Sequence, residues 1–150
     1  MEIITENEEE TQKEAVKFLE VVIESFNNPA IATVLALCGD LGSGKTVFVK
    51  GIAESLGIKE RVVSPTFVIE RRYKVDNHPT FSTLLHIDAY RLLPDEDLST
   101  LNWRETFKNK NILIVVEWPE NIEKEIPNGA FYVYFEVVSG SKRLIKYINE

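Results

Sequence analysis

A glycine-rich octapeptide at residues 39–46 is the strongest chemical signal in the sequence. It reads Gly39-Asp40-Leu41-Gly42-Ser43-Gly44-Lys45-Thr46 and matches the pattern G-x-x-x-x-G-K-[ST] at every fixed position. Glycines let such a loop turn with positive φ, so that backbone N–H groups point inward and form a phosphate cradle with the following helix N-terminus. Lys45 would reach the β- and γ-phosphates, and the Thr46 hydroxyl would take one position on Mg²⁺. The alternative is a β–α turn without a ligand.

Two acidic residues stand at the ends of apolar segments. Asp88 follows Leu84-Leu85-His86-Ile87, and Glu117 follows the apolar run at residues 112–116. If both runs are strands, their carboxyl ends meet at the sheet edge where open α/β folds bind ligands. Phosphate transfer needs oriented Mg²⁺ and a positioned water, so Lys45, Asp88 and Glu117 are the predicted catalytic residues. Their spacing does not decide which acid contacts Mg²⁺ and which orients water.

Three further features carry both a functional and a structural interpretation. Ser64-Pro65-Thr66 precedes an extended segment, where a threonine facing the γ-phosphate would complete the Mg²⁺ shell; taken alone, it is a turn. Arg91 would balance developing phosphate charge, or it forms a structural ion pair. Trp118, directly after Glu117, is either a recognition group or a packed aromatic. Neither His86 nor His78 has the spaced partners that a zinc site requires.

Composition restricts the class of protein. The chain has 150 residues, 17 basic and 24 acidic, a net charge of −7 and one cysteine, Cys38. The acidic balance disfavours direct binding of nucleic acid or an anionic membrane. A single cysteine is typical of a reducing compartment, the first residues are acidic where a targeting peptide would be basic, and no apolar run approaches a membrane span. We therefore expect a cytoplasmic protein.

The hydrophobic pattern predicts the elements that position these residues. We expect a helix beginning at Thr11, where Thr11 and Glu14 fit a capping box, and a second helix over residues 45–56 that Gly57 ends. A short helix is expected over residues 95–103. Buried strands are expected at residues 31–38 and 112–116, and hairpins at 67–75 with 81–88 and at 131–138 with 143–148. This predicts one domain, residues 1–150, with an α/β, P-loop NTPase-like three-layer fold and a mixed central sheet.

In order, the sequence contains the loop at residues 39–46, Ser64-Pro65-Thr66-Phe67, His86-Ile87-Asp88-Ala89-Tyr90-Arg91-Leu92 and Val116-Glu117-Trp118-Pro119. With these four motifs the chain resembles the TsaE (YjeE) family over roughly residues 11–143. The resemblance implies a small bacterial P-loop ATPase required for threonylcarbamoyladenosine (t6A) modification of tRNA position 37. It also implies that TsaD and TsaB are protein partners, that ATP or ADP with Mg²⁺ is the ligand, and that tRNA is reached only through the complex.

Residue by residue, the resemblance implies that Lys45 and the loop amides bind the phosphates. It implies that Thr46 and Glu117 bind Mg²⁺ and that Asp88 acts in catalysis or in the outer metal shell. Residues 64–67 would be a switch-like segment, and Thr11 would lie near the adenine. This chain has Phe67 where the family often has tyrosine and Ala89 where it often has leucine.

Two other functions share the phosphate loop. A small-molecule or nucleotide kinase would need an acceptor pocket and usually an arginine-rich lid, but Arg71, Arg72, Arg91 and Arg104 are scattered along the chain. A non-catalytic binding module would use ATP as a structural ligand, and the two strand-end acids argue against it. We expect slow hydrolysis by the chain alone, with the state of the nucleotide controlling attachment to the partners.

Overall fold

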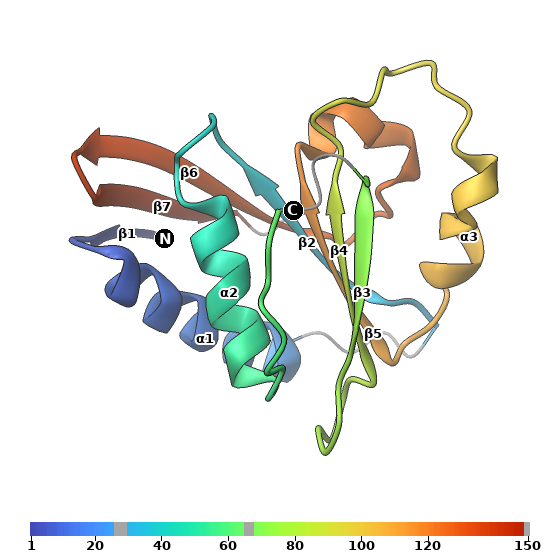
Figure 1. The fold of residues 1–150 in the computed structure, drawn as a ribbon, viewed down its shortest axis with the longest axis horizontal. Coiled ribbons are helices and arrows are strands. Elements are labelled where there is room, and N and C mark those ends of the chain that lie inside the picture. The colour runs from blue at the N-terminus through green and yellow to red at the C-terminus, as the bar shows by residue number, and fades with distance from the viewer. Residues whose placement is uncertain (26–29, 65–67, 149–150) are drawn as a thin grey trace.

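The fold is built on one seven-stranded sheet (Figure 1). It is described by a computed structural model over residues 1–25, 30–64 and 68–148. The strand order is β1-β7-β6-β2-β5-β4-β3. The strands are β1 (Glu2–Thr5), β2 (Thr33–Cys38), β3 (Glu70–Lys74), β4 (Thr83–Asp88), β5 (Ile112–Glu117), β6 (Phe131–Ser139) and β7 (Lys142–Ile148).

The middle of the sheet is parallel and its flanks are antiparallel, so the predicted mixed sheet is confirmed. Strand β2 lies between β5 and β6, and β4 extends the parallel set beyond β5. The pairs β3–β4, β6–β7 and β1–β7 are antiparallel. In the parallel register Glu117 lies opposite both Leu37 and Asp88. The ends of β2, β4 and β5 therefore meet at one edge, where the glycine-rich loop begins.

Helical elements cover both faces of the sheet and give three layers (Figure 1). Helices α1 (Glu8–Ser25) and α2 (Lys45–Ser55) pack on one face, against residues such as Leu35, Leu37 and Val115. The other face carries α3 (Trp103–Thr106) and the 3₁₀ segments η1 (Ser99–Leu101) and η2 (Pro119–Glu125). Because β2 and β5 are buried on both faces, they read as continuous apolar runs.

Helices α1 and α2 touch at a glycine. A Cβ atom at Gly51 would lie 2.5 Å from the Gln12 carbonyl oxygen and 2.8 Å from Gln12 Cα. Both atoms belong to the backbone of α1, so neither can rotate away. Gly51 therefore sets how closely the two helices approach, and α2 carries the phosphate loop at its N-terminus.

We expect Gly51→Ala to reduce the free energy of unfolding by about 1–3 kcal/mol, because the methyl group must push the two backbones apart. This net reduction remains after the roughly 1 kcal/mol by which alanine favours a helix over glycine, because the backbone of α1 cannot rotate away from the new methyl group. Urea unfolding measures the change, and Glu54→Ala, at an exposed position of the same helix, is the control. A Gly51→Ala protein as stable as the wild type would contradict this close packing.

The predicted start of the first helix was wrong. Helix α1 begins at Glu8, three residues before Thr11. Asn7 caps it, because the Glu10 N–H donates to Asn7 Oδ1 at 2.9 Å while Glu10 Oε2 accepts the Glu6 N–H at 2.6 Å. Thr11 is instead buried in the first turns, with its hydroxyl 2.8 Å from that of Thr5. Two cap patterns overlap in the sequence, and the structure uses the earlier one.

The predicted helix over residues 95–103 was also wrong. Only η1 and the single turn α3 form, separated by Asn102 at φ 57°. Asp97 Oδ1 accepts the Ser99 N–H at 3.0 Å and Glu96 Oε2 accepts the Leu93 N–H at 3.1 Å. These acidic side chains satisfy local turns in place of helical bonds. Strand β1, which pairs with β7, was not predicted because four residues of mixed polarity give little signal.

Both predicted hairpins are confirmed by the pairing of β3 with β4 and of β6 with β7, although Phe67, the predicted start of the first hairpin, lies outside the described residues. The β3–β4 turn contains His78, whose Nδ1 accepts the N–H groups of Thr80 and Phe81 at 3.1 Å each. The ring also stacks on Phe81. Nδ1 therefore has to be unprotonated, and burial lowers the pKa of His78.

A lowered pKa means that the unfolded chain binds a proton at His78 more readily than the folded chain does. We therefore expect the stability that this turn contributes to be present above the ordinary histidine pKa of about 6.5 and to be lost as the pH falls below it. Urea midpoints at neutral and mildly acidic pH test this. His78→Asn removes the titrating group from the turn and should weaken the dependence; an unchanged dependence would contradict the assignment.

Candidate functional site

The loop between β2 and α2 has the backbone that its glycines predict. Gly42 and Gly44 have φ values of 76° and 108°, a region that L residues seldom adopt. At Gly39 a Cβ atom would lie 2.6 Å from Ser43 Oγ and 2.8 Å from the Phe135 carbonyl oxygen. Helix α2 starts at Lys45, and the first amides of a helix have no partner within it. The loop and this helix end therefore present N–H groups to an anion.

Lys45 places its ammonium group inside the site. The side chain is buried, its Nζ donates to the Gly39 carbonyl, and the same atom lies 3.8 Å from the centre of the Trp118 ring. Burial lowers the pKa of Lys45, and the negative charges of Glu117, Glu120 and Asp88 oppose that shift. A cation in this setting is poorly solvated, which makes an incoming phosphate a favourable partner.

Glu117 and Asp88 lie side by side at the ends of β5 and β4. Glu117 Oε1 accepts the Thr46 hydroxyl at 3.2 Å, and Glu117 Oε2 lies 2.7 Å from His86 Nε2. Asp88 Oδ1 accepts the Tyr90 N–H at 2.9 Å, and Asp88 Oδ2 accepts the Ser64 hydroxyl at 2.8 Å. Both carboxylates are buried, and neighbouring groups fix the orientation of each.

A cleft of about 250 Å³ joins these groups. It includes most of the predicted site residues, and its described lining comprises Glu8, Thr11, Leu41, Gly42, Ser43, Gly44, Lys45, Thr46, Val47, Ser64, Asp88, Glu117, Trp118, Ser141 and Arg143. The buried Ser43 hydroxyl has no hydrogen-bond partner among the described atoms. The cleft therefore holds an unsatisfied donor beside the helix N-terminus.

Not every predicted site residue lies in the cleft. Asp40 is exposed and contributes its carbonyl, which accepts the Ser43 N–H, but it is absent from the lining. Arg91 is exposed and also lies outside the lining. Trp118 does line the cleft, with its ring 5.0 Å from that of Tyr90. Of the switch-like segment, Ser64 contacts Asp88, whereas Pro65 and Thr66 lie outside the described residues.

The contribution of the C-terminal hairpin to the cleft was not predicted from the sequence. The Arg143 guanidinium donates to the Gly42 carbonyl at 3.0 Å and to the Gly140 carbonyl at 2.6 Å, so it ties the β6–β7 turn to the phosphate loop. Ser141 from the same turn lines the cleft. Nothing in the local sequence marks these residues, because the contact spans 101 positions. His86 was detectable, since it lies two residues before Asp88 and so faces the same side of β4.

The residues present suit Mg²⁺ rather than a metal that proteins enclose completely. A hydroxyl oxygen of Thr46 and a carboxylate oxygen of Glu117 are the hard ligands that Mg²⁺ prefers. Over the described ranges, no group of three or more His, Cys, Asp or Glu side chains is arranged to hold a metal. A cation here would need phosphate and water as its other ligands, as Mg²⁺ commonly does.

In the described parts of the chain, no helix is both long and apolar enough to span a membrane.

A glycine-rich loop that runs from a buried parallel strand into a helix, opposite acids on neighbouring strands, defines an α/β protein of the P-loop class. The family model "Threonylcarbamoyl adenosine biosynthesis protein TsaE" matches residues 5–145. The chain belongs to the TsaE family, which confirms the resemblance drawn from the four motifs.

Individual relatives agree with this membership. A "tRNA threonylcarbamoyladenosine biosynthesis protein TsaE" from Bacillus subtilis is 35% identical over 143 residues, covering 95% of this chain and 82% of the relative. A protein of the same name from Rickettsia felis is 34% identical over 148 residues, covering 98% and 79%. A crystal structure of Bacillus subtilis YdiB superposes with a TM-score of 0.73 and 30% identity, covering 99% of this chain and 84% of that one. The same fold therefore extends over nearly the whole chain.

Proposed function

We propose that this chain binds Mg·ATP in the cleft and hydrolyses it to ADP and phosphate in support of t6A modification of tRNA adenosine 37. The convergence of Lys45, Thr46 and Glu117 carries the proposal: a buried ammonium group lies beside the loop, and the Thr46 hydroxyl lies 3.2 Å from a carboxylate on another strand. A β–α turn without a ligand has no need of a buried cation facing a cleft.

The loop residues have distinct roles in this proposal. The amides over residues 40–46 bind the phosphates, and the Lys45 ammonium neutralises charge on the β- and γ-phosphates. Thr46 and Glu117 would hold Mg²⁺, which when bound supplies charge neutralisation at the phosphate oxygens. Thr11 is buried at the start of α1 in the wall of the cleft, and in this proposal it would lie near the adenine.

The contacts of Asp88 support a water-positioning role for its carboxylate. Its two oxygens accept hydrogen bonds from Ser64 and from the Tyr90 backbone, so the carboxylate holds a fixed direction at the cleft wall. In hydrolysis a water oxygen bonds to the γ-phosphorus while the bond to the ADP oxygen breaks, and one water proton passes to Asp88 or to a phosphate oxygen while the other stays on the transferred oxygen. Asp88 either positions this water or acts in the outer shell of the metal, and a comparison of Asp88→Asn with Glu117→Gln separates these two roles.

We propose TsaD and TsaB as the protein partners, with tRNA reached only through their complex. The net charge of −7 supports an indirect role, because a protein that binds tRNA itself would present a basic face. The nucleotide state would control attachment to the partners, and turnover by the chain alone would be slow. A cytoplasmic location stays a prediction from composition.

Calorimetric titration with Mg·ATP and Mg·ADP, followed by product analysis, tests the proposal. We expect binding of both nucleotides and release of free phosphate. A phosphorylated small molecule in place of free phosphate would favour the kinase alternative. The position of Arg91 outside the cleft disfavours that alternative, because a kinase usually closes an arginine-rich lid over the phosphates. Binding without any turnover, with or without TsaD and TsaB, would favour the binding-module alternative. No binding of either nucleotide would refute the proposal.

A further inference from the structure

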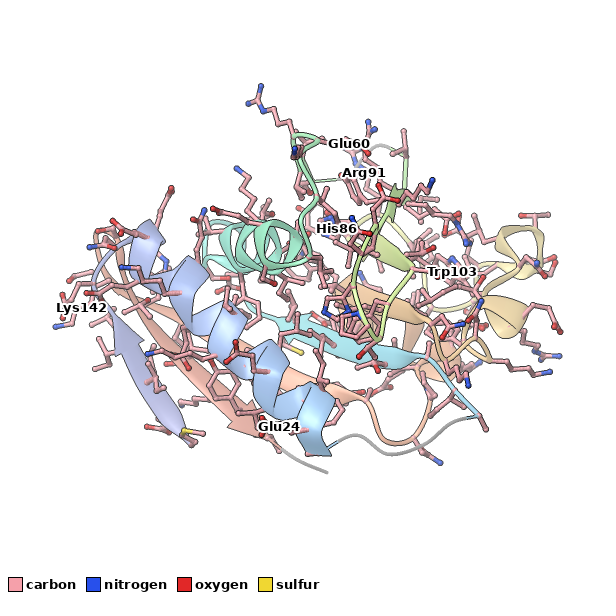
Figure 2. The ribbon with its side chains drawn as sticks, turned by 90° about the horizontal axis from the view of Figure 1, so that it is seen from below. Glu24, Glu60, His86, Arg91, Trp103 and Lys142 are labelled. Atoms are coloured by element: carbon pink, nitrogen blue, oxygen red, sulfur yellow. The ribbon has the colours of Figure 1, made fainter. Side chains whose placement is uncertain are left out.

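His86 is a polar residue buried within strand β4. Figure 2 labels His86 among the side chains of the sheet. The residue has no exposed surface, and Glu117, which it contacts, is 3% exposed. Its neighbours along β4 are Leu84, Leu85 and Ile87, all fully buried and apolar. Burial of polar or charged side chains costs free energy that their contact offsets only in part, and apolar residues of similar volume often serve stability as well or better. Stability alone is therefore a poor explanation for this pair.

The strand register explains how the two side chains meet. Asp88 lies opposite Glu117, and His86 lies opposite Val115, so His86 is the diagonal neighbour of Glu117 on the same face. The imidazole Nε2 lies 2.7 Å from Glu117 Oε2. Nδ1 is buried without a partner among the described atoms. A carboxylate oxygen only accepts hydrogen bonds, so Nε2–H is the donor in this contact.

This contact divides the two oxygens of Glu117 between two tasks. Oε2 is occupied by His86, and Oε1 is directed to the Thr46 hydroxyl at 3.2 Å. A carboxylate held at one oxygen by a fully buried ring cannot rotate freely, and its other oxygen stays pointed at the phosphate loop. Groups that hold a metal ligand in this way commonly affect metal affinity as well as geometry.

We infer that His86 is a positioning residue that orients the Glu117 carboxylate toward the cation site at Thr46. The inference rests on the proposed function, because it assigns His86 a part in cation binding. His86 acts through Glu117 and is absent from the residues that line the cleft. It therefore governs how tightly the divalent cation is held, and it leaves the contacts of the loop with the phosphates unchanged.

The test compares three variants with the wild type, using Mn²⁺ as the probe for the cation. His86→Gln keeps an N–H donor near the position of Nε2, His86→Leu removes it, and His86→Asn keeps an amide that falls short of Glu117. Electron paramagnetic resonance measures Mn²⁺ affinity in the presence of ADP, and calorimetry measures ADP affinity in EDTA. Ile87→Val, which removes one methyl group from the opposite face of β4, controls for a general loss of stability.

We expect Mn²⁺ affinity to fall by about 10- to 100-fold in His86→Leu and His86→Asn. The affinity for ADP in EDTA should stay at the wild-type value in both variants, and His86→Gln should recover most of the loss. Ile87→Val should leave both affinities unchanged. His86→Asn and His86→Gln keep the test decisive if His86→Leu does not fold.

Two results would overturn the inference. One is wild-type Mn²⁺ affinity in a folded variant that lacks the donor. The other is a parallel loss of ADP affinity in EDTA and of Mn²⁺ affinity that His86→Gln does not recover, as a purely structural role predicts. If the wild type itself binds ADP but no Mn²⁺, the proposed metal site fails, and the inference fails with it for that separate reason.

Discussion

Lys45→Ala is expected to remove most ATP binding and to reduce any remaining phosphate release by on the order of 10²–10³-fold. The ammonium group is the buried cation of the cleft, and its Nζ lies between the Gly39 carbonyl and the Trp118 ring. Without it, the charge of the β- and γ-phosphates faces Glu117 and Asp88 with less compensation. Calorimetric titration and a phosphate-release assay measure the two effects.

The matched control for Lys45 is Lys50→Ala, which removes a lysine at an exposed position of the same helix and should change neither quantity. Lys45→Arg should not restore activity, because the longer, planar guanidinium group does not fit between a carbonyl and a ring placed for a compact ammonium. ATP affinity at the wild-type level in Lys45→Ala would contradict the assignment.

Glu117→Gln is expected to reduce phosphate release by on the order of 10²-fold while ADP affinity in EDTA stays at the wild-type value. The substitution keeps the size of the side chain but removes the charge that would face Mg²⁺ beside Thr46. The variant should need more Mg²⁺ to reach its own maximal rate, so the assay is run as a Mg²⁺ titration at saturating ATP. Glu54→Gln, at an exposed position of α2, is the control.

Asp88→Asn separates the roles of the two acids. If Asp88 positions water, this variant should have a lower maximal rate with an unchanged Mg²⁺ requirement, whereas Glu117→Gln should change both. The opposite pattern would exchange the assignments. A Glu117→Gln protein that hydrolyses ATP at the wild-type rate over the whole Mg²⁺ range would show that Glu117 holds no metal.

The elements nearest the phosphate loop could be predicted because local rules decide them. The glycines at 42 and 44 take positive φ, and continuous apolar runs indicate strands buried on both faces. Asp88 and Glu117 could be placed together because parallel strands bring their carboxyl ends to one edge. The start of α1 was mistaken because Asn7 and Thr11 both begin acceptable caps, and the contact between Thr11 and Thr5 that favours the earlier one requires the sheet.

The rest of the site depends on contacts that only the folded chain brings together. Arg143 reaches Gly42 because β6 pairs with β2 and β7 pairs with β6, an arrangement that no local pattern records. His86 was recognised as a strand residue, but its partner is 31 positions away and only the register of β4 with β5 selects it. The predicted helix over residues 95–103 does not form, because acidic side chains accept hydrogen bonds from nearby backbone amides in local turns.

Phosphate release from Mg·ATP, measured for this chain alone and with purified TsaD and TsaB, is the decisive test of a partner-coupled ATPase. Lys45→Ala supplies the blank. We expect slow release by the chain alone and marked stimulation when both partners are present, with no stimulation of the Lys45→Ala protein. Equal release with and without the partners, together with no complex between them in any nucleotide state, would contradict a partner-coupled ATPase.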